Sequence, residues 1–134
     1  MHYLSAEEVL IIHAALIDRT GGLAGTRDAG LFQSVLVRPR QSFQGKERYP
    51  SMPEKAAAYL HGFAVGHVFA DGNKRIGFAA AVRFLTQNGY QFSATNQEVE
   101  SFVLSVVTDR KTVKQVAGWL EHFTIPMSAS SSRM

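Results

Sequence analysis

The chain has 134 residues, of which 46% are hydrophobic and 19% charged; this is typical of one soluble globular domain and excludes a largely disordered protein. There is no cysteine, so disulfides, thiolate metal sites and a cysteine nucleophile are excluded. The net charge of +3 favours anionic ligands only weakly, because the basic residues are scattered and form no run that would indicate direct binding of nucleic acid.

The sequence has no pattern of a membrane protein. No apolar run approaches the roughly 20 residues that cross a bilayer. Glu7 and Glu8 stand where a signal peptide would carry basic residues. We therefore expect a cytoplasmic protein that does not enter a membrane.

Four segments begin with the signature of a capping box, in which the first side chain accepts from the third helical amide and the third side chain reaches back. The four pairs are Ser5 with Glu8, Ser51 with Glu54, Thr95 with Glu98, and Thr112 with Gln115. An apolar-periodic segment follows each pair. These signals predict an all-α domain, with 90–92 as a short extended piece.

The first helix is expected over about 6–19 and should end at the two glycines of 21–22. Leu10, His13 and Ile17 share one stripe of this helix, which predicts that they face the core. His13 is therefore interpreted as a structural histidine.

A second, shorter helix should follow Asp28 and end before Pro39, because proline pushes the preceding residue out of helical geometry. The segment 41–50 is then interpreted as a loop. Phe43 and Tyr49 are its candidate anchors.

The third helix should start after Ser51 and carry one apolar stripe. The spacing of Ala56, Leu60, Phe63 and His67 predicts that His67 lies at the inward-facing end of this helix.

A fourth helix is predicted over about 73–87, ended by 88–89. Its stretch 76–82 holds no charge, which indicates a buried central helix. Arg83 is then expected to be a buried ion-pair partner. Two more helices complete a single domain of residues 1–126, and 127–134 is predicted to be a flexible tail.

In the last helix, Trp119, Leu120 and Phe123 are interpreted as core packing rather than as a partner-binding groove.

The junction between the third and fourth helices combines several groups that suit a phosphate. Free amides at a helix N-terminus attract anions, and Gly72 lets the backbone approach a ligand closely. Lys74 and Arg75 add positive charge, and an arginine can bind a phosphate through two hydrogen bonds. Asp71 suits a Mg²⁺ ion accompanying the phosphate, and His67 can accept a hydroxyl proton near neutral pH.

These residues indicate phosphoryl transfer. The alternative is a plain helix-connecting turn with a capping aspartate, solvated cations and a structural histidine. A zinc site of His61, His67 and Asp71 is disfavoured, because 61 and 67 match poorly on a helix.

The segment HVFADGNKR, residues 67–75, resembles the Fic/Doc signature: a histidine, a phenylalanine two later, an acidic residue two later, then Gly-Asn and a closing arginine. Segments 25–31, 49–50 and 54–58 are also similar to the Doc-type branch, the death-on-curing toxins. The resemblance spans about 21–89 and implies a compact Fic fold of about six helices around a buried central helix.

The resemblance implies that His67 deprotonates a hydroxyl on a target protein and that Asp71 holds the Mg²⁺ of Mg-ATP. Phe69 would anchor the loop, and 41–50 would be the flap that orders the target segment. Four residues would bind nucleotide phosphates, the first two as an anion hole: Gly72, Asn73, Lys74 and Arg75.

Two departures from the commoner Fic pattern favour the Doc branch. Lys74 replaces a second glycine, and Phe78 replaces a second arginine that binds terminal phosphates. Doc toxins transfer the γ-phosphate of ATP to a threonine of elongation factor Tu, so the resemblance implies a toxin that blocks translation. The motif's Gly72, where Doc toxins more often have alanine, leaves Fic-type AMP transfer open as the alternative.

The resemblance further implies control by a Phd-like antitoxin, whose flexible tail folds onto the toxin. An in-chain inhibitory motif, Ser/Thr-x-x-x-Glu-Gly/Asn, is not matched, since Val9, four residues after Ser5, stands at the place of the glutamate. A non-catalytic helical binding module is a second alternative.

Overall fold

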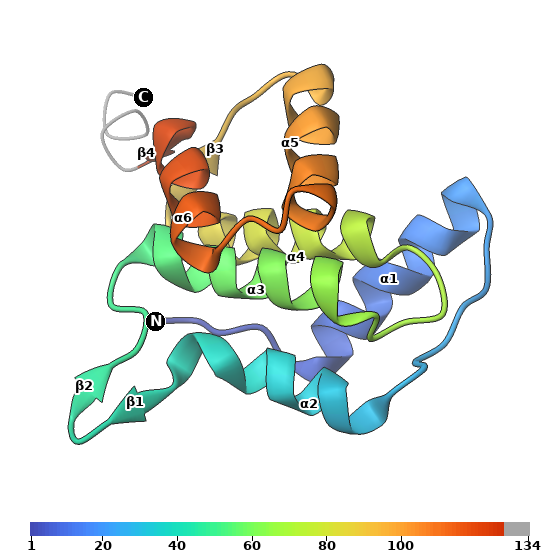
Figure 1. Cartoon of the computed structure of the whole chain (residues 1–134), viewed down its shortest axis with the longest axis horizontal. Helices are drawn as coiled ribbons and strands as arrows, with labels where there is room; N and C mark the ends of the chain where they lie inside the picture. The colour runs from blue at the N-terminus through green and yellow to red at the C-terminus, as the bar shows by residue number, and fades with distance from the viewer. Residues whose placement is uncertain (128–134) are drawn as a thin grey trace.

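The computed structural model describes residues 1–127, which form an all-α domain with two small strand pairs (Figure 1). The helices are α1 (Ala6–Thr20), α2 (Ala29–Val37), η1 (a 3₁₀ turn, Arg38–Arg40), α3 (Met52–Gly66), α4 (Asn73–Gln87), α5 (Asn96–Thr108) and α6 (Val113–His122). The strands are β1 (Ser42–Phe43), β2 (Lys46–Glu47), β3 (Tyr90–Phe92) and β4 (Thr124–Pro126). The predicted fold class is confirmed. No helix within these residues is long and apolar enough to cross a membrane.

Local capping explains where most helices begin. All four predicted capping boxes are formed, at the starts of α1, α3, α5 and α6. Asp28 caps α2, its side chain accepting from the amide of Leu31. Of the six α-helices in residues 1–127, α4 alone begins without a side-chain cap, at Gly72.

Helices α3 and α4 lie side by side at the centre of the molecule. Helices α1 and α2 lie along one side of this pair, and α5 and α6 stand across the other (Figure 1). The two central helices approach closely at Gly77, where an added Cβ would lie 2.7 Å from the carbonyl oxygen of Leu60. A side chain at that position would force the helices apart.

The helix enclosed on most sides is α3 and not α4. Most of α3 from Lys55 to Ala64 is buried. The α4 helix buries one face, whereas Phe78, Ala79 and Val82 on its other face are only half-buried. The prediction that 76–82 belongs to a buried central helix therefore holds for one face: no residue of the stretch is exposed, but α1 and α5 leave a gap along the face of Phe78, Ala79 and Val82.

Three predictions outside α4 also need correction. Segment 41–50 contains the β1–β2 hairpin rather than a plain loop, and its Phe43 is 76% exposed, whereas Tyr49 is buried as expected. On α1 the buried stripe is Val9, His13 and Ile17, and Leu10 is 41% exposed. The short extended piece expected at 90–92 is a strand, β3, which pairs with the unpredicted β4.

The predicted boundary between domain and tail falls at the edge of the described chain. The Met127 amide donates to the carbonyl of Gly89 at 2.9 Å, so residue 127 belongs to the folded part. The remaining predicted tail residues, 128–134, lie outside the described residues.

Candidate functional site

The α3–α4 junction is a short loop held at its middle by two buried residues. Helix α3 ends at His67, whose backbone is left-handed at φ 52° and ψ 46°. Val68 and Phe69 are buried, while Ala70 and Asp71 are exposed. The two buried residues anchor the loop in the core, and the polar His67 and Asp71 on either side of them are exposed.

Phe69 is the anchor of the loop. Its ring stacks on His13 of α1, with ring centroids 3.8 Å apart and 13° between the planes. Phe32 of α2 and Phe63 of α3 pack around the same ring at 5.6 and 6.2 Å. Elements from three helices therefore fix the position of the loop.

Asn73 locks the loop to the first turn of α4. Its Oδ1 accepts from the amide of Phe69 at 2.9 Å, and its Nδ2 donates to the carbonyl of Phe69 at 3.0 Å. The side chain is thus fully engaged with the loop. Only the main-chain amide of Asn73 is available for the anion hole predicted here.

The segment after α1 runs alongside the loop and holds its backbone. The amides of Arg27 and Asp28 donate to the carbonyl of Val68, and the amide of Ala70 donates to that of Gly25. The Arg27 Nε also donates to the carbonyl of His67 at 2.9 Å. The similarity seen in 25–31 therefore belongs to a segment in direct contact with the motif.

Asp71 is held by one of its two carboxylate oxygens. Its Oδ2 accepts from the amide of Leu23 at 2.7 Å, and the backbone of Gly22 packs against its side chain. The second oxygen, Oδ1, has no protein partner within residues 1–127. One free carboxylate oxygen suits Mg²⁺, which takes one or two carboxylates together with phosphate oxygens and water.

Protein side chains alone do not form a metal site here. Residues 1–127 contain no group of three or more His, Asp or Glu placed to hold a metal ion, so His61, His67 and Asp71 do not form one. The chemistry of this donor set fits a cation that arrives with a phosphate ligand.

The start of α4 presents unpaired amides. Gly72 is left-handed at φ 78°, and the first intrahelical bond runs from the Ile76 amide to the Gly72 carbonyl at 2.9 Å. The amides of 73–75 precede this bond, so they have no partner within the helix. Lys74 and Arg75 are exposed and form no ion pair within residues 1–127. Positive partial charge and two cations therefore gather at this helix end.

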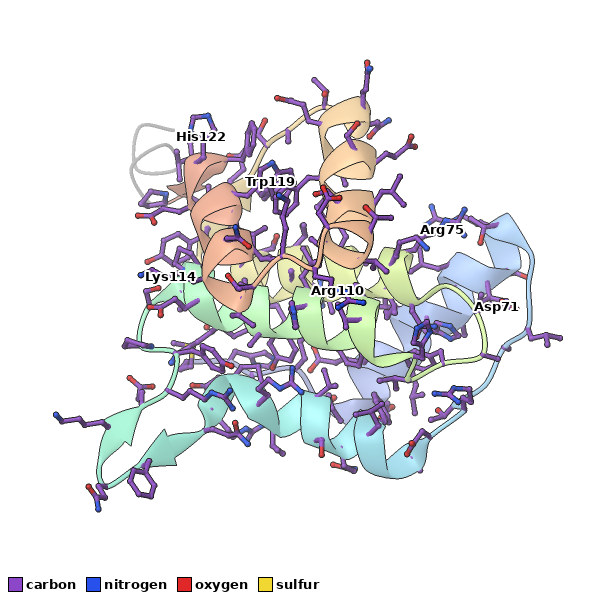
Figure 2. All side chains as sticks on the ribbon, viewed as in Figure 1. Asp71, Arg75, Arg110, Lys114, Trp119 and His122 are labelled. Carbon is purple, nitrogen blue, oxygen red and sulfur yellow. The ribbon has the colours of Figure 1, made fainter. Side chains whose placement is uncertain are left out.

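Figure 2 places Asp71 on the loop and Arg75 on the first turn of α4, at the same end of the molecule. His67 precedes them on the loop and is exposed. The prediction that His67 faces inward is wrong, because α3 ends one residue earlier and the left-handed cap breaks the helical stripe. The exposure leaves its imidazole open to a ligand.

A groove of about 970 Å³ extends from the start of α4 along its open face, between α1 and α5. Its α1 wall is made by Ile12 and Leu16, and its floor includes Phe78. Neither His67 nor Asp71 lines it. The predicted burial of Arg83 in an ion pair is wrong: Arg83 is exposed on the groove and has no salt bridge in the described chain.

The packing of the last helix agrees with its prediction. Leu120 is buried, and Trp119 stacks on Phe102 of α5 with ring centroids 4.2 Å apart. Phe123 packs on Trp119 at 5.2 Å.

The fold and the site together define a class: a helical domain in which an uncapped helix start and exposed histidine, carboxylate and cationic side chains meet at one junction. Comparison with known proteins makes this specific. The sequence profile of the Fic/DOC family matches residues 3–85. The chain is 40% identical over 92 residues to Toxin Doc of Mycolicibacterium smegmatis, covering 69% of this chain and 68% of that protein. It is 34% identical over 120 residues to Protein kinase doc of Escherichia phage P1, covering 90% of this chain and 94% of that protein.

The chain therefore belongs to the Fic/DOC family, in its Doc-type branch.

Sequence reasoning did not connect three groups with the site: the ring of His13, the amide of Leu23 and the side chain of Arg27. Each lies 40 or more residues from its partner in the chain. The one usable signal was a histidine on the buried stripe of the first helix. Nothing in its spacing identifies residue 71 as its partner.

Proposed function

We propose that this protein is a Doc-like toxin that transfers the γ-phosphate of ATP to a serine or threonine hydroxyl of a target protein. Elongation factor Tu is the proposed target. The observation that carries the proposal is the uncapped start of α4, with its free amides, beside exposed His67 and Asp71. The relatives named as a toxin and as a protein kinase support the same activity.

In this proposal the phosphates lie at the start of α4, where the amides of 73–75 and the cations of Lys74 and Arg75 neutralise their charge. Asp71, with one carboxylate oxygen free, would hold the Mg²⁺ of Mg-ATP, and the ion would supply further charge neutralisation. The hydroxyl oxygen of the target forms a bond to the γ-phosphorus while the bond to the bridging oxygen breaks and ADP leaves. The hydroxyl proton passes to His67.

Phe78 favours phosphoryl over AMP transfer. It lies one turn beyond the start of α4, lines the apolar groove and packs on Phe92 with ring centroids 5.4 Å apart. An apolar ring at this place offers no grip on terminal phosphates, so the reacting γ-phosphate is better held at the helix start. AMP transfer is the alternative.

The groove supports control by a second chain. Apolar side chains of α1, α4 and α5 line most of it, and its charged residues are Lys74 and Arg75 at the start of α4 with Arg83 and Glu100 further along. We propose that a Phd-like antitoxin lays the apolar face of a folding segment into this groove, next to the start of α4.

The test incubates the antitoxin-free protein and Mg²⁺ with a lysate and ATP labelled on either the α- or the γ-phosphate. We expect protein label from γ-labelled ATP alone. Label from the α position alone would show AMP transfer instead, and label from neither would favour the non-catalytic binding module.

The matched variants are His67→Ala and His122→Ala, since both histidines are exposed. Figure 2 shows His122 toward the opposite end of the molecule from Asp71 of the loop. We expect only the first to abolish transfer and toxicity, with antitoxin binding retained in both. Equal activity of both variants would contradict the role of His67.

A further inference from the structure

His13 of α1 makes a contact with the site that the proposed chemistry does not use. It is 2% exposed, and its Nε2 lies 2.8 Å from the main-chain carbonyl oxygen of Asp71. Its ring stacks on Phe69, the anchor of the loop. A core histidine is thus tied to the peptide group that leads into α4.

The partner of His13 determines which nitrogen of its ring carries a proton. A carbonyl oxygen can only accept, so the Nε2 of His13 must carry a proton. The contact is part-buried, so loss of the donor leaves the carbonyl without its protein partner at a cost in free energy.

The bond also orients the next amide. In a trans peptide the C=O and N–H groups point in opposite directions. Because the Asp71 carbonyl points at His13 in the core, the amide of Gly72 points away from it, and this amide has no acceptor among the described residues. Gly72 is the N-cap of α4, so its amide lies at the same helix end as those of 73–75.

The fit between α1 and this peptide leaves little freedom. A Cβ added at Gly72 would lie 3.2 Å from the Cδ1 of Ile17 and 3.6 Å from the Nε2 of His13. Rotation of the peptide away from its present orientation would therefore lose the hydrogen bond and disturb the contact with α1.

We propose that His13 is a positioning residue that sets the orientation of the Asp71–Gly72 peptide and thereby aims the Gly72 amide at the phosphate of the nucleotide. The inference rests on the proposed function for the identity of the ligand. It gives α1, outside the motif, an indirect part in nucleotide binding, through the orientation of this peptide.

The main test compares His13→Phe, which keeps a stacking ring but has no donor, with His13→Gln, whose amide can restore the donor. Val116→Ala in α6 is a control for lost core packing, since Val116 is buried away from the site. The measurements are the melting temperature, the affinity for Mg-ADP by calorimetry, and the shift of the Gly72 amide in ¹⁵N-resolved spectra during the same titration.

We expect His13→Phe to weaken Mg-ADP binding about tenfold and to reduce the shift at Gly72, as lost orientation of one hydrogen-bond donor would. His13→Gln should recover most of both effects, and Val116→Ala should lower the melting temperature without either. In the transfer assay, His13→Phe should raise KM for ATP more than it lowers kcat. Unchanged affinity in His13→Phe at a lowered melting temperature would overturn the inference.

A second measurement needs no substitution. The ¹⁵N spectrum of the wild-type imidazoles should show His13 protonated at Nε2, and a neutral ring protonated at Nδ1 would overturn the inference even if His13→Phe does not fold. Failure of the proposed function gives a different result: a wild-type protein that transfers no label, whatever its binding of Mg-ADP and the state of His13.

Discussion

Replacing Asn73 with alanine separates two roles that this residue could have. In the structure its side chain makes both hydrogen bonds to the backbone of Phe69 and none outward. If the side chain braces the loop, its loss must lower stability as well as activity. If it contacts the phosphate instead, activity falls and stability is kept.

The magnitude follows from the two bonds. Each is part-buried and contributes about 1 kcal/mol, so Asn73→Ala should lower the free energy of unfolding by about 2 kcal/mol. A chain of 134 residues has an unfolding entropy near 0.28 kcal/mol per kelvin, so the melting temperature should fall by about 7 °C. Thermal unfolding followed by circular dichroism measures this directly.

Asn73→Asp is the matched control. It keeps the oxygen that accepts from the Phe69 amide but loses the donor to the Phe69 carbonyl, and its charge suits a helix N-terminus, so its melting temperature should fall by about half as much as that of Asn73→Ala. Its carboxylate should nevertheless repel phosphate and reduce transfer at least as much as alanine does. A melting temperature of Asn73→Ala within 2 °C or so of wild type would refute the bracing role.

Two further predictions concern the β1–β2 hairpin and the loss of stability at acid pH. Lys55 is 1% exposed, and its ammonium donates to Glu47 at 2.7 Å and to the Tyr49 carbonyl at 2.5 Å. Lys55→Met removes both bonds, so we expect trypsin to cleave the β1–β2 hairpin several-fold faster than in wild type. An unchanged cleavage rate would show that Lys55 does not hold the hairpin. Hydrogen bonds, first from Gln87, lower the pKa of Glu8 from 4.5 to about 2, so its stabilisation is present above about pH 4.5 and is lost as the pH falls toward 2. Glu8→Gln should therefore lower the free energy of unfolding by about 1 kcal/mol at pH 6, a value kept small because solvent screens this partly exposed group, and by little at pH 2. Urea unfolding at both pH values measures this. An equal loss at both would contradict the lowered pKa of Glu8.

The sequence by itself determined the helices and the place of the motif. A capping box needs only residues three apart, so the starts at Ser5, Ser51, Thr95 and Thr112 could be predicted without knowledge of the rest of the chain. The glycine and proline boundaries are equally local. The resemblance carried by 67–75 also pointed to the family that the comparisons then established.

Tertiary structure alone decided which faces are covered. The exposure of Phe43 and Arg83 depends on elements distant in sequence, as does the pairing of β4 with β3. The same holds for the contact between His13 and the Asp71 carbonyl, 58 residues apart. Helical periodicity shows that a residue belongs to a stripe, whereas the approach of other elements determines whether that stripe meets the core, a groove or solvent.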